Sequence, residues 1–220
     1  MFEPRVELTR LEKEIVAFEE KPIEKGLIMF YGSSGLTRWG TRFKHRPLEE
    51  DIRMKDGSPA AINHGFGSST AEELLYYYPR AVKPWAPRAL IVSIVHNDRG
   101  KGYNVNEIMT NLAKLLEYAR TDFPGIKLYI CDARPLLKNG QQRFNDEFLQ
   151  SIKEYCGRHA DTQCITHAEC TGLWKDPADA GKYEAELLRE ELYVADMIHF
   201  NQAGYDVYRD FMLKRLDDLL

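Results

Sequence analysis

A pair of serines between glycines offers the first candidate nucleophile in the chain. It occurs in Gly32-Ser33-Ser34-Gly35, directly after the apolar run at 27–31. Glycines on both sides of a serine pair suit a tight turn from a strand into a helix, with a hydroxyl presented at the edge of a sheet. A nucleophilic serine needs that exposure, a base to take its proton, and donors that stabilise an oxyanion. An ordinary glycine–serine turn and a phosphate-binding loop are the alternative interpretations.

A base and its partner stand near the end of the sequence. Asp196 and His199 are three residues apart in Asp196-Met197-Ile198-His199. On a turn, the carboxylate can hold the Nδ1–H of the histidine and leave Nε2 free to act as a base. Taken alone, the Asp-x-x-His pattern is a weak signal.

Two more segments supply hydrogen-bond donors after predicted strands. In residues 63–70 (NHGFGSST), two glycines and three small hydroxyl residues would let backbone N–H groups approach a ligand closely. In His96-Asn97-Asp98, the Asn97 side chain could donate to an oxyanion from beside the serine loop. A capped loop in the first case and a turn-forming Asn-Asp pair in the second are the alternatives.

The elements predicted around these segments would bring them to one edge of a sheet. Apolar runs rich in β-branched or aromatic residues predict five strands, at 27–31, 59–63, 89–95, 126–131 and 162–166. Apolar residues at helical spacing predict helices at about 7–19, 106–120, 145–157 and 202–219. Asn201 is the expected N-cap of the last helix. This alternation predicts a parallel sheet covered on both faces, with ligands beyond the carboxyl ends of its strands.

Composition narrows the class of protein. The chain has 220 residues, of which 44% are hydrophobic, and a net charge of −4, which suits one domain with a full core. Lys and Arg form no block, so we expect no nucleic-acid partner. The apolar runs are far shorter than the ~20 residues of a membrane span, and residues 1–21 show no secretory signal. These features predict a cytoplasmic protein with one domain over residues 1–220, on which residues 1–25 pack as a helical extension.

In order along the chain, the chemical segments resemble the four sequence blocks of the SGNH hydrolases, also called GDSL-like lipases/acylhydrolases. The blocks correspond to residues 30–34, residues 63–70, Asn97-Asp98 and residues 196–205, and the last, Asp-x-x-His-x-Asn-x-x-Gly-Tyr, is the most specific. Residues 78–88 also look like the approach to the third block in bacterial members. The likeness extends from about residue 27 to the C-terminus. It implies an α/β fold, a flavodoxin-like three-layer α/β/α sandwich with a five-stranded parallel sheet, in agreement with the strands predicted above.

The resemblance implies a serine esterase that needs no cofactor or metal and hydrolyses a small-molecule ester, with short acyl or acetyl chains favoured. It makes Ser34 the nucleophile, His199 the general base and Asp196 its orienting partner. It implies that the oxyanion is held by the backbone N–H groups of Ser34 and Ser68 and by the Asn97 side chain. The further residues expected to contact substrate are Gly67, His96 and Trp39.

Three positions depart from the family pattern. Ser33 stands where Asp is usual, a variation that some family members share. Ser68 aligns with the glycine whose N–H serves the oxyanion, and Val95 stands where glycine is common, two residues before Asn97. Because a β-branched residue does not take a positive φ cheaply, Val95 puts the loop around Asn97 in question. These departures motivate an alternative function, a non-catalytic acyl-ester or carbohydrate-binding protein on the same fold.

Two other kinds of site are disfavoured. Cys164, His167 and Cys170 have metal-ligand spacing, but Cys164 lies in a predicted strand and no fourth ligand is evident, so we expect no metal. A flavin- or nucleotide-binding protein would need a phosphate loop, and neither GxGxxG nor a Walker A pattern is present. Residues 38–58 and 170–181 are charged and irregular, and they are expected to form long surface loops that carry function.

Overall fold

A parallel sheet of five strands forms the centre of the computed structural model, which describes residues 4–138 and 142–220. Its strand order is β2-β1-β3-β4-β5. The strands are β1 (Ile28–Gly32), β2 (Ala61–Gly65), β3 (Ala89–Ser93), β4 (Lys127–Cys131) and β5 (Thr162–Ile165). All five predicted strands are confirmed, with bounds that differ by one or two residues at most.

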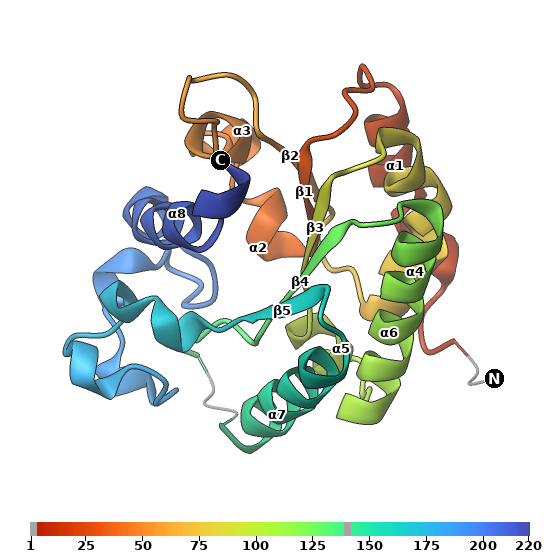
Figure 1. Cartoon of the computed structure of the whole chain (residues 1–220). Helices are drawn as coiled ribbons and strands as arrows, with labels where there is room; N and C mark the ends of the chain where they lie inside the picture. Colours follow the sequence, from red (N-terminus) through yellow and green to blue (C-terminus); the bar gives the residue numbers. More distant parts are fainter. Residues whose placement is uncertain (1–3, 139–141) are drawn as a thin grey trace.

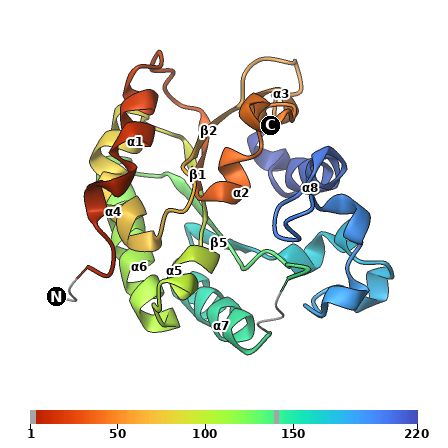
Figure 2. The same ribbon diagram turned by 180° about the vertical axis from the view of Figure 1, so that it is seen from behind.

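Helices cover both faces of the sheet, as the opposite views in Figure 1 and Figure 2 show. One layer contains α1 (Glu12–Glu19), α4 (Ala71–Ala81), α6 (Val105–Asp122) and α7 (Gln142–Arg158). The other contains α2 (Ser34–Thr37), α3 (Leu48–Asp51) and α8 (Gln202–Arg215), while the short α5 (His96–Gly100) follows β3. This arrangement is the three-layer α/β/α sandwich that was predicted. Within the described ranges, no helix combines the length and the apolar character that crossing a bilayer requires.

Side chains of the central strand β3 alternate between the two layers. Leu90 and Val92 pack with the helices α4 and α6, whereas Ala89 and Ile91 pack with the layer of α8. All four side chains are fully buried. A strand buried on both faces has no polar side to present, which is why this run is uniformly apolar in the sequence.

Side-chain caps define where α4 and α8 begin. Thr70 and Glu73 form a capping box at the start of α4. Asn201 accepts the backbone N–H of Gly204 at 3.1 Å and caps α8, as predicted. The second cap fixes the start of α8 just after His199, so the helix end helps to hold the predicted base.

The N-terminal segment packs on the layer of helices that contains α4. Its predicted helix forms α1, preceded by a short 3-10 helix, and Ile15 and Phe18 of α1 are buried in the same core as α4. The Phe18 ring stacks on His64 of β2 with ring centroids 4.3 Å apart. These contacts support the interpretation of residues 1–25 as an extension packed on one domain, which stays a prediction.

The two segments predicted to be surface loops instead contribute to the core, and this prediction is corrected. Residues 38–58 contain α3, and their side chains Trp39 and Leu48 are fully buried. In residues 170–181, Trp174 is buried in the same way. Elements of three or four residues are too short to show a helical period, so the sequence pattern looked irregular. The 3-10 helices of the described chain are Leu8–Leu11, Thr41–Phe43, Lys83–Trp85, His167–Glu169, Thr171–Leu173, Pro177–Asp179, Ala185–Leu187, Glu190–Leu192 and Asp217–Leu219.

Candidate active site

The loops after β1 and β3 meet where the strand order reverses, which is the place where open α/β sheets bind ligands. A cavity of about 430 Å³ lies at this edge. Its walls include one residue from each of the four sequence blocks, namely Ser34, Ser68, Asn97 and His199. The fold therefore gathers segments that are up to 165 residues apart in the chain.

Ser34, His199 and Asp196 form a hydrogen-bonded chain beside the cavity. The Ser34 Oγ lies 2.8 Å from the Nε2 of His199, and the His199 Nδ1 lies 2.7 Å from the Oδ2 of Asp196. The Oδ1 of Asp196 accepts the backbone N–H groups of Ile198 and His199, each at 2.9 Å. A serine, an imidazole and a carboxylate in this order let the imidazole take the serine proton.

A turn with a left-handed residue lets Asp196 reach back to His199. Met197 has a positive φ of 59° within this turn. On the N-terminal side, the backbone N–H of Val194 donates to the carbonyl of His199 at 2.9 Å. On the C-terminal side, the cap of α8 at Asn201 holds the chain. The Asp-His pair is therefore fixed from both ends.

Close packing of α2 on β2 positions Ser34, the first residue of α2. A Cβ on Gly65 would lie only 2.5 Å from the Cβ of Leu36, so glycine is required at this crossing. From α8, the Tyr205 hydroxyl donates to the carbonyl of Gly35 at 2.8 Å. These two contacts hold the turn that presents the Ser34 hydroxyl to His199.

The predicted oxyanion donors all belong to residues that line the cavity. Ser34 is the first residue of α2, so its backbone N–H has no partner within the helix. The Asn97 Nδ2 donates to the carbonyl of Ser69 at 3.0 Å, which orients the amide and leaves its second hydrogen for a ligand. The loop of Ser68 completes this side of the cavity.

Ser68 and Val95 both adopt the backbone conformation of the glycine that is usual at their positions. Their φ angles are 66° and 134°. A non-glycine residue held in such a region costs on the order of 1–3 kcal/mol, and the surrounding structure must offset it. Val95 is buried, and packing around it holds the angle. The chain thus follows the glycine-like course at these two positions at the cost of strain.

An arginine from the N-terminal segment supports the Ser68 loop. Arg10 donates through Nη2 to the carbonyl of Ser68 at 2.6 Å, and it pairs with Glu73 at 2.7 Å. Glu73 in turn accepts the backbone N–H of Thr70 in the capping box of α4. Sequence reasoning missed Arg10, because a contact between residues 58 positions apart leaves no local pattern.

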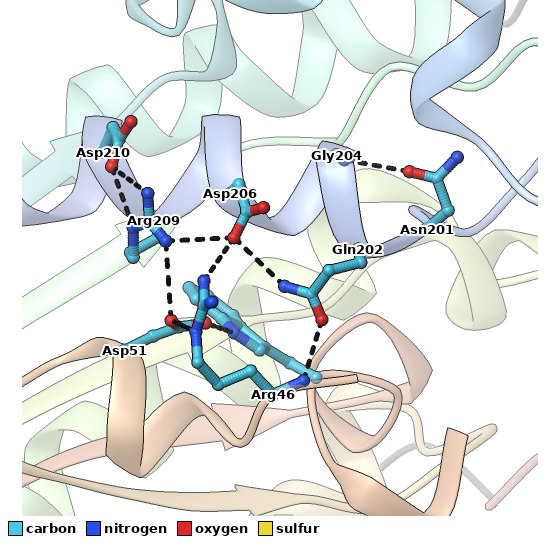
Figure 3. Close-up of polar contacts among 9 residues, drawn as sticks. Arg46, Asp51, Asn201, Gln202, Gly204, Asp206, Arg209 and Asp210 are labelled. Carbon is cyan, nitrogen blue, oxygen red and sulfur yellow. Dashed lines mark hydrogen bonds and ion pairs between the residues drawn. The ribbon is translucent and has the colours of Figure 1, made fainter. Parts of the chain in front are cut away.

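Trp39 lies in the core and not at the cavity, which corrects the prediction that it contacts substrate. Its side chain is fully buried, and its indole N–H donates to Asp51 at 2.7 Å. Asp51 pairs in turn with Arg46 and Arg209. Figure 3 shows this polar network between α8 and the segment that carries Asp51. Trp39 therefore anchors the α3 segment to α8, and it belongs to the scaffold of the site.

Two other residues were expected to contact substrate. His96 lines the cavity, whereas Gly67 is not among the described residues that line it. The His96 Nε2 lies 2.9 Å from the carbonyl of Arg134. Burial lowers the pKa of His96 to about 4, and the positive charge of Arg134 adds to this effect. His96 is therefore neutral at pH 7 and donates to that carbonyl.

The surroundings of His199 and Asp196 lower the pKa values of both side chains below those of the free groups. Burial first, and then the charges of Arg134 and Arg38, lower the pKa of His199 to about 4 against the opposing contact with Asp196. For Asp196, burial acts to raise the pKa, but hydrogen bonds from His199 and Ile198 outweigh it and lower the pKa to about 2. At neutral pH, His199 is neutral and Asp196 is ionised, as a base and its orienting partner require.

The Cys164-His167-Cys170 segment forms no cluster of metal-binding groups in the part of the chain that the structure describes. His167 instead pairs with Asp132, with its Nδ1 2.5 Å from the Oδ1 of the carboxylate. Both residues line the cavity. Sequence reasoning missed this second His-Asp pair because its members follow different strands, β5 and β4.

The comparisons with known proteins agree with the geometry. The sequence model of the GDSL-like Lipase/Acylhydrolase family matches residues 30–207, a range that contains all four blocks. No curated protein sequence matches the chain significantly. A solved structure of a candidate platelet activating factor from Streptococcus pneumonia is 21% identical, with a TM-score of 0.75 over 97% of this chain and 94% of that one.

Two further structures share the fold. The GDSL-like lipase from Bacteroides thetaiotaomicron VPI-5482 is 15% identical, with a TM-score of 0.70 over 97% of this chain and 100% of that one. The psychrotrophic esterase EstA from Pseudoalteromonas sp. is 15% identical, with a TM-score of 0.63 over 88% of this chain and 98% of that one. The resemblance seen in the sequence is confirmed by the family model, and the chain belongs to the GDSL-like lipase/acylhydrolase family of ester-bond hydrolases.

Proposed function

We propose that the chain is a serine esterase that hydrolyses small carboxylic esters through an acyl-enzyme on Ser34. Its membership of an ester-hydrolase family supports the class of reaction. The observation that carries the residue assignment is the 2.8 Å contact between the Ser34 Oγ and the His199 Nε2 at the cavity. A cavity of about 430 Å³ lies in the lower part of the range of ligand sites, which favours a small ester with a short acyl chain.

The reaction follows from the positions of these groups. His199 takes the proton of Ser34 as the Ser34 Oγ attacks the ester carbonyl carbon. The oxyanion of the tetrahedral intermediate accepts hydrogen bonds from the backbone of Ser34 and Ser68 and from Asn97. His199 then passes its proton to the alcohol oxygen as the carbon–oxygen bond breaks. A water molecule that loses its proton to His199 attacks the acyl-enzyme, and the acid leaves as Ser34 regains its proton.

The direct test is the release of nitrophenol from p-nitrophenyl acetate and p-nitrophenyl butyrate. The wild-type protein should hydrolyse both esters, and the Ser34→Ala protein should lose nearly all of this activity. Equal rates for the two proteins would contradict the proposal. The alternative function, a non-catalytic acyl-ester or carbohydrate-binding protein, requires binding without release of acid by the wild-type protein. The cytoplasmic location and the lack of a nucleic-acid partner stay predictions from composition.

Removing the Asn97 side chain should lower kcat by about 10²–10³-fold, because one of the three oxyanion donors is lost. The effect on KM should be small, since the donor acts on charge that develops in the transition state. Steady-state kinetics of Asn97→Ala on p-nitrophenyl acetate provide the measurement. Asn106→Ala makes the same change at an exposed position of α6 and serves as the control. A fall in kcat of less than about threefold would show that the Asn97 side chain does not donate to the oxyanion.

The acid limb of the kcat/KM profile should lie near pH 4. A general base works only when it is unprotonated, and burial lowers the pKa of His199 to about 4 from its ordinary 6.5. Activity should therefore persist at pH 5 and fall only as pH drops through about 4. Nitrophenol is best followed at a wavelength where its two protonation states absorb equally. An acid limb at pH 6.5 or above would show that His199 titrates as an exposed histidine.

A further inference from the structure

Arg134 places a cation beside Gly35, the residue after the predicted nucleophile, although ester hydrolysis itself requires none there. Arg134 follows β4, which is two strands away from β1 in the sheet. Its side chain nevertheless lines the cavity and reaches Gly35, where an added Cβ would lie 2.8 Å from the Arg134 Nη1. The Nη2 donates to the carbonyl of Ile198 at 2.9 Å. The guanidinium group therefore lies between the residue after Ser34 and the residue before His199.

Part of this guanidinium group has no protein partner. The Nε of Arg134 is buried and makes no hydrogen bond within the described residues. The Nη1 also has no hydrogen-bond partner there and is not among the buried atoms, so it is the nitrogen that a ligand in the cavity can reach. Across residues 4–138 and 142–220, no carboxylate forms an ion pair with Arg134 or with Lys138, which also lines the cavity. The cavity thus contains positive charge that the protein does not neutralise.

Asp132 is the carboxylate nearest to Arg134 in the sequence, and both of its oxygens already accept hydrogen bonds from other residues. Its Oδ1 accepts the backbone N–H of His167 at 2.8 Å and meets the Nδ1 of the same residue at 2.5 Å. Its Oδ2 accepts the hydroxyl groups of Thr166 and Tyr183, each at 2.8 Å. Asp132 therefore serves His167 and its neighbours, and it makes no hydrogen bond to Arg134.

The charges of the cavity wall favour one negative group. Three cations line it, and one of them, Arg38, is paired with Asp196 at 3.3 Å. The other two, Arg134 and Lys138, face a single lining carboxylate, Asp132, which leaves one positive charge when histidines are counted as neutral. This excess occurs in a chain whose net charge is −4, so it is a local property of the cavity.

We propose that the substrate is an ester that carries a carboxylate, which binds Arg134 together with Lys138. This inference rests on the proposed esterase function and names its substrate class. A guanidinium group presents N–H donors in a fork that fits a carboxylate, and such charge-assisted bonds are strong. The carboxylate site follows β4, whereas the oxyanion donors follow β1, β2 and β3. Different residues of the cavity wall therefore hold the two negative groups of the substrate.

Matched pairs of esters test the proposal. On the acyl side, mono-4-nitrophenyl glutarate is compared with 4-nitrophenyl pentanoate, which has the same chain length without the carboxylate. On the alcohol side, 4-acetoxybenzoate is compared with its methyl ester. In at least one pair, the wild-type kcat/KM should favour the anionic ester by about tenfold or more, and salt should weaken this preference. The pair that shows the preference identifies the side of the ester that carries the charge.

Variants of the protein then show which residues produce the preference for the anionic ester. Arg134→Gln should bring the anionic-to-neutral ratio of kcat/KM close to one. Gly35→Ala should lower the ratio without removing a charge, because the new Cβ displaces the flexible end of Arg134. Lys127→Gln removes one positive charge at the exposed start of β4, at the opposite edge of the sheet, and should leave the ratio unchanged. A wild-type ratio of one or less, or an unchanged ratio in Arg134→Gln, overturns the proposal.

A binding experiment separates this proposal from the esterase function on which it rests. Monomethyl glutarate and methyl pentanoate are titrated into Ser34→Ala protein by calorimetry, with and without Arg134→Gln. If the wild-type protein turns over no ester, the esterase function fails. The carboxylate site still stands if monomethyl glutarate binds more tightly than methyl pentanoate and Arg134→Gln abolishes the difference. Equal binding of the two esters overturns it.

Discussion

Replacing Ser34 with alanine should reduce kcat for p-nitrophenyl acetate by at least about 10⁴-fold. The hydroxyl is the atom that forms the acyl-enzyme, and loss of a nucleophile that acts together with its base removes their joint contribution. Among the described residues, the one hydrogen bond of the His199 Nε2 is with the Ser34 Oγ. The residual rate should come from the oxyanion donors and from substrate binding alone. Initial rates at saturating substrate, corrected for spontaneous hydrolysis, provide the measurement.

The neighbouring serine provides the matched control. Ser33 stands in the same turn and carries the same hydroxyl group, but it makes no hydrogen bond with His199. Ser33→Ala should retain most of the activity. The assignment of the nucleophile would be wrong if Ser33→Ala lost the activity and Ser34→Ala kept it.

Changing Asp196 to asparagine should lower kcat by about 10³–10⁴-fold with little change in KM. The amide can keep the hydrogen bonds that the Oδ1 of Asp196 accepts from the backbone of Ile198 and His199. At the other position, however, an NH₂ group faces the His199 Nδ1, which favours the tautomer with its proton on Nε2. An imidazole in that tautomer cannot take the Ser34 proton, and the negative charge that stabilises the imidazolium is also gone.

Asp218→Asn makes the same substitution at an exposed position near the C-terminus and should leave the kinetics unchanged. Far-ultraviolet circular dichroism of both variants checks that the turn around Asp196 has not unfolded the protein. A loss of kcat smaller than about tenfold in Asp196→Asn would mean that the carboxylate does not orient His199.

Local features of the sequence were sufficient to predict the sheet and the ends of its strands. Burial on both faces makes a run such as Ala89–Ser93 uniformly apolar, and this signal needs no knowledge of its neighbours. The residues that directly follow such runs, Ser34 and Asn97, were predicted for the same reason. A parallel sheet brings the carboxyl ends of all its strands to one edge, so the topology places them together.

Contacts between distant segments could not be predicted in this way. Trp39 looked like a loop residue because its burial depends on α8, which lies more than 150 positions further along the chain. Arg134 follows β4 but acts beside Gly35, and only the absence of a side chain at Gly35 admits its guanidinium group. Asp132 and His167 each look ordinary in sequence, and only the pairing of β4 with β5 makes them neighbours.

Residue type alone also failed to predict the backbone conformation at Ser68 and Val95. A preference for glycine predicts the backbone that suits a position, but it does not predict whether packing can force another residue into it. Here Val95 takes a φ of 134° while fully buried, and Ser68 takes 66° while its carbonyl accepts a hydrogen bond from Arg10. The strain is a property of the whole fold, which a short motif does not contain.

The central claim is that Ser34 is a nucleophile activated by His199, and covalent labelling with a fluorophosphonate tests it most directly. The Oγ of an activated serine displaces fluoride from phosphorus, and the protein gains the mass of one phosphonyl group. We expect one label on the wild-type protein, located by peptide mass spectrometry at Ser34, and none on Ser34→Ala or His199→Ala. An unlabelled wild-type protein, or a label that persists in Ser34→Ala, would contradict the account.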